Sequence, residues 1–184
     1  MVSDPIWIGS REDGMADSRR IVDALVRSRR GGLAAGAALC GLALIGSLAY
    51  RALRGAAPPE AGGPDFTQVA EDEARLMLRA MVAATTADGM VDAAERKRLD
   101  AAVAEAGLDP DGRSWLDREL ADPADVDAIA ERVASPDAAA RIFAAARLAI
   151  DPDTLQERQF LKMLAEALDL PAETTERVER DIAA

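Results

Sequence analysis

Two short acidic segments contain the residues of this chain whose types and spacing best suit chemistry. Residues 87–96 read ADGMVDAAER, and residues 149–158 read AIDPDTLQER. Each segment joins two stretches in which apolar residues recur at helical spacing. Together the segments carry six acids that could ligate a metal ion: Asp88, Asp92, Glu95, Asp151, Asp153 and Glu157. Carboxylates beside the unpaired carbonyls of a helix end are the oxygen ligands that calcium and magnesium prefer, so a weak site for one of these ions is one interpretation.

Helix capping is the alternative interpretation of the same acids. Asp92 and Glu95 are three residues apart at an expected helix start, as in a capping box, and Asp151 can cap the helix that follows it. Gly89 is expected to end the preceding helix in a left-handed conformation. Capping does not account for Asp88, which would face the negative end of a helix dipole. Neither segment has the spacing of an EF-hand loop, so a metal site here would be irregular.

The residue types that the chain lacks exclude several classes of site. There is no His among the 184 residues, which excludes histidine general bases, Ser-His-Asp or Cys-His nucleophiles and imidazole metal ligands. The single Cys, Cys40, excludes an intrachain disulfide and a thiolate zinc cluster. A pair of carboxylates acting as acid and base would need an apolar pocket to raise the pKa of one of them, and nothing in the sequence indicates such a pocket. We therefore expect no catalytic residues, no required cofactor and a protein that is not an enzyme.

The charge of the chain restricts its partners. It has 33 acidic and 22 basic residues, a net charge of -11, and residues 65–184 hold 27 of the acids against 14 basic residues. A domain of this charge repels phosphate backbones, so we expect no nucleic-acid binding. Cations and basic protein partners are favoured instead.

The C-terminal region, residues 65–184, is expected to be a compact all-α bundle of about seven short helices. Its composition is rich in Ala and Leu and poor in β-branched and aromatic residues, which disfavours a large β-sheet. Four dipeptides place a capping oxygen before a proline and are expected to mark helix starts: Asp109-Pro110, Asp122-Pro123, Ser135-Pro136 and Asp151-Pro152.

Residues 31–50 form a run of twenty positions without a charge, GGLAAGAALCGLALIGSLAY. As a helix the run would be about 30 Å long, which is enough to cross the hydrocarbon core of a bilayer. Arg29 and Arg30 precede it, and Tyr50 and Arg51 stand where interfacial anchors are found. We expect a single transmembrane helix here. A buried helix of a soluble domain and a cleaved signal peptide are the alternatives.

The segments around this run are expected to be simpler. Residues 1–30 are expected to be disordered, except for an amphipathic turn around Ile21 and Val26 that could lie on a membrane surface. Residues 51–64, rich in Pro, Gly and Ala, are expected to be a flexible linker. Within the span, small residues recur on one face and could pack a second copy of the helix, which makes a homo-oligomer one possibility: Gly32, Gly36 and Gly41.

The stretches EARLMLRAMVAATTADGMVDAAER and AAARLAIDPDTLQERQFLKMLAEALDLP resemble the TerB-like helical domain of tellurite-resistance proteins. With the hydrophobic run before it, the arrangement is similar to the YebE-type inner-membrane proteins of unknown function. The resemblance covers about residues 69–184. It implies an all-α bundle, no catalytic activity and acidic residues that hold divalent cations, which would map to the six acids named above.

The resulting hypothesis is a single-pass protein of the bacterial inner membrane. Six Arg before the span and two shortly after it predict a cytoplasmic N-terminus, whereas TerB proteins are cytoplasmic, so the side of the C-terminal domain stays open. The expected function is a non-enzymatic module that binds a divalent cation or a basic protein partner, in an envelope or stress response. The alternative is a structural scaffold that self-associates through residues 31–50.

Overall fold

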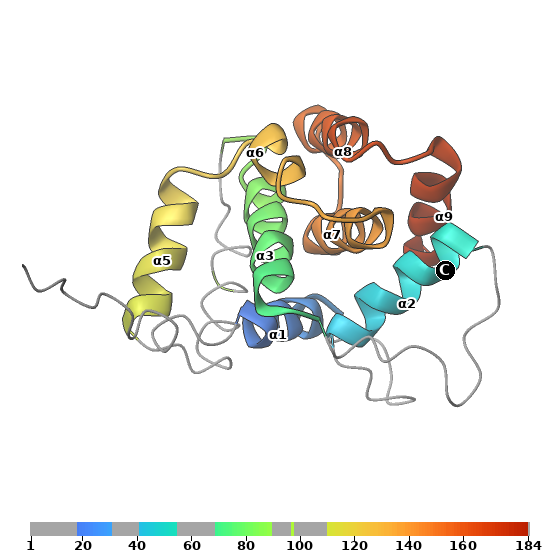
Figure 1. Ribbon diagram of the computed structural model, residues 1–184. Helices are drawn as coiled ribbons and strands as arrows, with labels where there is room; N and C mark the ends of the chain where they lie inside the picture. The colour runs from blue at the N-terminus through green and yellow to red at the C-terminus, as the bar shows by residue number, and fades with distance from the viewer. Residues whose placement is uncertain (1–17, 31–40, 55–68, 90–96, 98–109, 184) are drawn as a thin grey trace, which may run out of the picture.

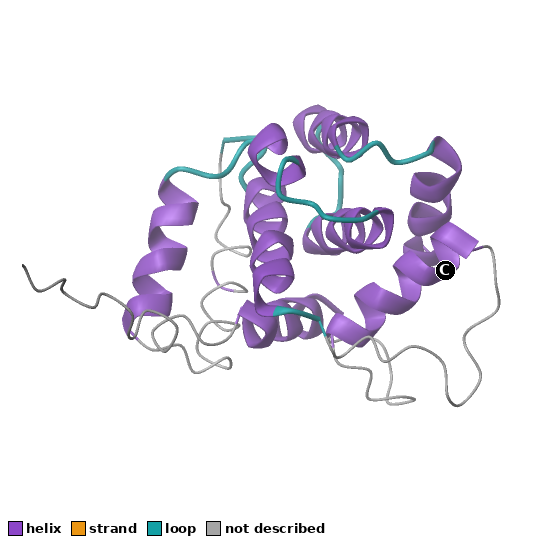
Figure 2. Cartoon of the chain, viewed as in Figure 1, coloured by secondary structure: helices purple, strands orange, loops and turns teal. Residues whose placement is uncertain are grey.

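The part of the chain that the computed structural model describes is built from α-helices, as the sequence predicts. It comprises residues 18–30, 41–54, 69–89, 97 and 110–183, and no strand occurs within it. Figures 1 and 2 show how its helices cluster into a bundle. In chain order they are α1 (Ser18–Arg30), α2 (Gly41–Arg54), α3 (Glu71–Thr85), α5 (Pro110–Ala121), α6 (Val126–Ala130), α7 (Pro136–Ala149), α8 (Leu155–Ala167) and α9 (Ala172–Ala183).

Helix α7 is the centre of this bundle. It packs against α1, α2, α3, α8 and α9, and its contact with α3 is the most extensive between any two described helices. Most of its residues are buried, including a series of alanines on several sides of the helix. A helix that is apolar around most of its circumference is stable only when other elements cover it. Alanine also allows the neighbouring helices to approach closely, and Ile142 and Phe143 of α7 belong to the same buried cluster as Leu78 of α3.

The helix starts follow the capping rules, although two of the predicted positions differ from the observed ones. Helices α5 and α7 begin at Pro110 and Pro136, as predicted. Helix α6 begins three residues beyond Pro123 because Asp125, whose carboxylate accepts from Ala128 N at 2.7 Å, is the N-cap. Helix α8 likewise begins three residues beyond Pro152, and its N-cap is Thr154 rather than Asp151, the cap expected from the sequence.

The apolar face of helix α1 packs into the core of the protein. Ile21, Val22 and Val26 are buried in the core, and α1 contacts α3, α2 and α7. The backbone N–H of Ser18 donates to Glu71 Oε1 at 2.7 Å, which joins the first turn of α1 to the first turn of α3. Residues 18–30 of the predicted N-terminal segment 1–30 therefore form a helix whose apolar face lies in the core. Residues 1–17 lie outside the described part.

Helix α2 contains the second half of the run that was expected to cross a membrane. Its buried residues Ile45, Leu48 and Ala52 face the core, and the helix lies against α7 and α9. None of the helices in the described residues combines the length and the apolar character that crossing a bilayer requires. Residues 31–40 lie outside the described part, so the span stays a prediction. Helix α2 continues through Arg54, so its last turn occupies the start of the segment assigned to a linker, whose residues 55–64 are also outside the described part.

Arginine–carboxylate pairs join neighbouring helices around the core. Arg79 of α3 pairs with Glu119 of α5 at 3.0 Å, and the Glu119 side chain is only 6% exposed. Arg141 of α7 pairs with Glu73 of α3 at 2.5 Å. A carboxylate as buried as Glu119 requires such a compensating charge. Part of the acidic excess of residues 65–184 is therefore neutralised within the fold.

Because α3 and α7 form the largest contact between two described helices, a cavity at a buried position of α3 is expected to lower the free energy of unfolding. Leu78→Ala, at a fully buried position of α3, is expected to lower the free energy of unfolding by about 2–5 kcal/mol. Leu155→Ala is the matched control, because the Leu155 side chain is 72% exposed, and its effect should stay within about 0.5 kcal/mol. Chemical denaturation of the full chain, followed by circular dichroism, measures both. Equal losses in the two variants would contradict this packing.

Candidate functional site

The acidic segment between α7 and α8 is organised by a capping box. Glu157 Oε2 accepts hydrogen bonds from Thr154 N at 3.0 Å and from Thr154 Oγ1 at 2.8 Å. Thr154 Oγ1 in turn accepts from Glu157 N at 3.2 Å. The Glu157 residue is only 6% exposed, and its carboxylate is directed at the first turn of α8. Its observed contacts are therefore those of a helix cap.

Arg158 lies against the loop that carries the other two acids of this segment. Arg158 Nη1 donates to Pro152 O at 3.0 Å and to Asp153 O at 2.7 Å. The side chains of Asp151 and Asp153 are exposed. The guanidinium thus binds the loop carbonyls that would be available as oxygen ligands for a cation.

The first acidic segment is described only in part. Helix α3 ends at Thr85, Thr86 Oγ1 donates to Val82 O, and Gly89 has the left-handed φ of 79° that the sequence predicts. Asp88 is exposed beside this turn. Asp92 and Glu95 lie outside the described part, as do Gly32 and Gly36 of the small-residue pattern, while Gly41 is the first residue of α2.

Within the described residues, no group of three or more acids is arranged so that it could hold a metal ion. Of the six predicted ligands, the structure places Asp151, Asp153 and Glu157 in one short segment without bringing their carboxylates together. A calcium or magnesium site at the two junctions therefore stays a prediction.

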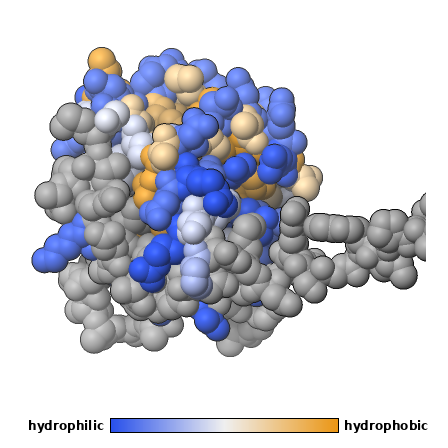
Figure 3. All heavy atoms as spheres, turned by 90° about the vertical axis from the view of Figure 1, so that its left-hand side faces the viewer, coloured by the Kyte–Doolittle hydropathy of each residue, from blue (hydrophilic) through white to orange (hydrophobic). Residues whose placement is uncertain are grey.

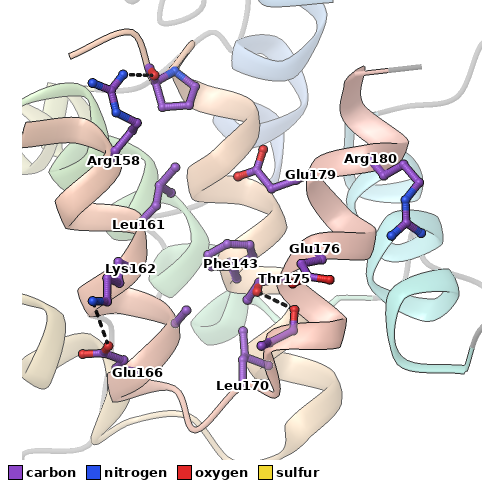
Figure 4. A pocket seen from close by; sticks show the side chains of 13 residues that line it. Phe143, Arg158, Leu161, Lys162, Glu166, Leu170, Thr175, Glu176, Glu179 and Arg180 are labelled. Carbon is purple, nitrogen blue, oxygen red and sulfur yellow. Dashed lines mark hydrogen bonds and ion pairs between the residues drawn. The ribbon is translucent and has the colours of Figure 1, made fainter. Parts of the chain in front are cut away.

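A pocket between α8 and α9 is a second candidate site. It has a volume of about 780 Å³ and lies over Phe143 of α7. Figure 4 shows α8 on one side of Phe143 and α9 on the other, with Leu170 below. Its lining includes the apolar residues Phe143, Pro152, Leu161, Ala165, Leu170 and Ala172. Its charged lining residues are Arg158, Lys162, Glu166, Glu176, Glu179 and Arg180.

The turn between α8 and α9 sets the shape of this pocket. Asp169 has a left-handed φ of 51°, Leu170 N donates to Ala165 O at 3.0 Å, and Asp169 N donates to Glu166 O at 3.1 Å. These bonds form a Schellman motif, which ends α8 and reverses the chain. Asp tolerates the left-handed region better than most residues. The motif places Leu170 on the pocket lining, from which the chain continues into α9.

Several charged groups of the pocket already have partners in the fold. Glu179 pairs with Arg147 of α7 at 2.6 Å, and Arg147 also donates to Ile150 O. Lys162 lies 3.9 Å from Glu166 on the same helix. The pocket therefore combines an apolar floor with a rim of both charges, a combination that suits binding.

Sequence reasoning missed this pocket because its lining comes from three helices, α7, α8 and α9, and the angle between α8 and α9 depends on the Schellman turn. Asp169 is not a glycine, so the usual sequence signal for that turn is absent. On the face drawn in Figure 3, hydrophobic residues reach the surface between hydrophilic ones.

The capping role of Glu157 leads to a prediction about calcium. Thr154→Ala removes one half of the capping box and is expected to lower the free energy of unfolding by about 1 kcal/mol. The loss should be the same in a chelator and in millimolar calcium, because the Glu157 carboxylate bonds to Thr154. Thr85→Ala is the control, since the Thr85 hydroxyl only donates to Met81 O within α3. A calcium-dependent stability that disappears in Glu157→Gln would contradict the capping role.

Comparisons with known proteins give a family for the chain. The model of the family "Protein of unknown function (DUF533)" matches residues 14–182, a range that includes α1 and α2. A similar protein is the "Uncharacterized protein in ampR 5'region" of Yersinia enterocolitica, 26% identical over 117 residues, which are 62% of this chain and 84% of that protein. No solved structure matches the chain. Because the family model covers most of its length, the chain belongs to the DUF533 family of proteins of unknown function.

Proposed function

We propose that this chain is a non-enzymatic helical binding module, associated with the bacterial inner membrane, that takes apolar side chains of a partner protein into the pocket between α8 and α9. The observation that carries the proposal is the apolar floor of that pocket, with Phe143, Leu161 and Leu170, inside a charged rim. The volume of about 780 Å³ lies in the range of pockets that bury most of a bound ligand.

The rim of the pocket favours a protein partner. Arg158, Lys162 and Glu166 line the α8 side, and Glu176, Glu179 and Arg180 line the α9 side, so each side carries charges of both signs. A partner that presents apolar groups flanked by charges of both signs would complement this rim, and amphipathic helices bind in grooves in this way. The net charge of -11 would attract a basic partner from a distance.

The chemistry of the pocket supports a binding role over an enzymatic one. The chain has no His, and Cys40 is its single Cys. In the described residues that line the pocket, Glu179 is bonded to Arg147 and Glu166 lies near Lys162. A binding module of this kind requires no cofactor, and the calcium or magnesium site remains a separate prediction.

The uncharged run supports the membrane part of the proposal. Twenty consecutive uncharged residues, 31–50, have the length that a bilayer crossing requires. The arginines before the run and the Tyr50-Arg51 pair at its end have the chemistry of interfacial anchors.

A photo-reactive amino acid placed in the pocket tests the binding role. We expect p-benzoylphenylalanine at Thr175, a pocket position on α9, to form a discrete adduct with another protein when the full chain is irradiated in cells. The same group at Gln156, an exposed position of α8 outside the pocket lining, is the matched control and should give no such adduct.

A blocking variant makes this test specific. Ala165→Leu extends a side chain into the pocket and should reduce the Thr175 adduct by about tenfold, since losing one well-packed apolar contact costs about 1–3 kcal/mol. The unfolding midpoint of the variant should match that of the original chain. Adducts of equal yield at both positions, or an adduct insensitive to Ala165→Leu, would refute the binding role of the pocket.

A further inference from the structure

Helix α9 forms one wall of the pocket and depends on α2 for its position. Among the described helices, α9 packs most extensively against α2 and less against α7. Figure 1 shows α2 and α9 side by side at one end of the bundle. Val178 of α9 is fully buried, as are Ile45 and Ala52 of α2. Removing α2 would therefore expose apolar surface on α9 and remove its main packing partner.

Polar contacts fix the C-terminal end of α2 to α9. Arg177 Nη1 donates to Ala52 O at 3.0 Å and so satisfies one of the carbonyls at the end of α2. Arg51 Nε lies 3.0 Å from Asp181 Oδ2. Arg177 and Asp181 are one turn apart on α9, so both bonds act on the same part of that helix.

The same α2 residues belong to the run that suits a bilayer. Residues 41–50 are the second half of the uncharged run 31–50, and Ile45 and Leu48 would be as well accommodated in lipid as in the core. Arg54 lies over the Tyr50 ring, 5.4 Å from its centroid, and both side chains suit an interface. A helix that crosses a bilayer, however, cannot also pack against α7 and α9.

We propose that α2 is shared between the domain and a lipid bilayer, so that membrane insertion of α2 and assembly of the α8–α9 pocket exclude one another. When α2 is docked, it holds α9 and the pocket is complete. When α2 enters a bilayer, α9 loses the contacts with Ala52 and Arg51 and keeps those with α7, so the distance between α8 and α9 is less tightly fixed. This inference rests on the membrane association proposed above, and it assigns partner binding to the state in which α2 is docked and bilayer crossing to the other state.

Spin labels across the pocket test the exclusion. The full chain carries Lys162→Cys on α8 and Glu176→Cys on α9, with Cys40→Ser so that only these two sites are labelled. The chain is synthesised in a cell-free system, with or without vesicles of phosphatidylethanolamine and phosphatidylglycerol. Flotation measures membrane association, and pulsed electron–electron double resonance measures the distance distribution between the labels.

The outcomes distinguish this inference from the membrane association on which it rests. A chain that floats with the vesicles and shows a distribution at least about twice as broad as the lipid-free one supports the exclusion. A chain that floats with an unchanged narrow distribution overturns the exclusion and leaves the membrane association intact. A chain that does not float overturns both.

A pair of α9 variants tests the coupling from the opposite direction. Asp181→Arg places a like charge beside Arg51 and leaves the uncharged run unchanged. Because the two charges repel, α2 should leave α9 more readily, and the fraction of the chain that floats with a limiting amount of lipid should rise about threefold. Glu176→Arg makes the same charge change on the pocket side of α9 and should alter flotation far less. Circular dichroism checks that both variants keep their helical content. Equal flotation of the two variants would contradict the coupling.

Discussion

The burial of α7 on several sides is the constraint on which the rest of this structure depends. Its alanines contribute little volume, so α7 is stable only when α3, α2 and the neighbouring helices cover it closely. Helix α2 therefore has a structural role as well as an apolar sequence, because it covers α7 and positions α9. The family match begins at residue 14, before α1, which agrees with a domain that includes both N-terminal helices.

The features that could be predicted from sequence are those that local chemistry determines. The helical class follows from the Ala- and Leu-rich periodicity, Ser135-Pro136 starts α7, and Gly89 adopts the left-handed conformation expected of it. The position of α2 could not be predicted in this way, because Ile45 and Leu48 suit a bilayer as well as they suit a protein core. Hydropathy measures how apolar a residue is, and it contains no information about which apolar surroundings the residue enters.

The candidate sites likewise combine features that local chemistry determines with features that depend on the fold. The pattern that suggested a cation site around Glu157 also fits a capping box, and the observed bonds to Thr154 are those of the cap. The role of Arg158 could not be foreseen, because it depends on how the chain turns from α7 into α8. The pocket depends on the left-handed Asp169, which breaks the usual preference for glycine, and on α9 being held by a helix more than a hundred residues earlier in the chain.

The central claim is that α2 is part of the folded domain in the absence of lipid. Amide hydrogen–deuterium exchange of the full chain, read by mass spectrometry, tests it most directly. We predict that the amides of residues 45–52 are protected to the same degree as those of α9, because the two helices pack against each other and are joined through Arg177 and Asp181. Exchange of residues 45–52 at the rate of an unstructured peptide, with α9 still protected, would contradict the account.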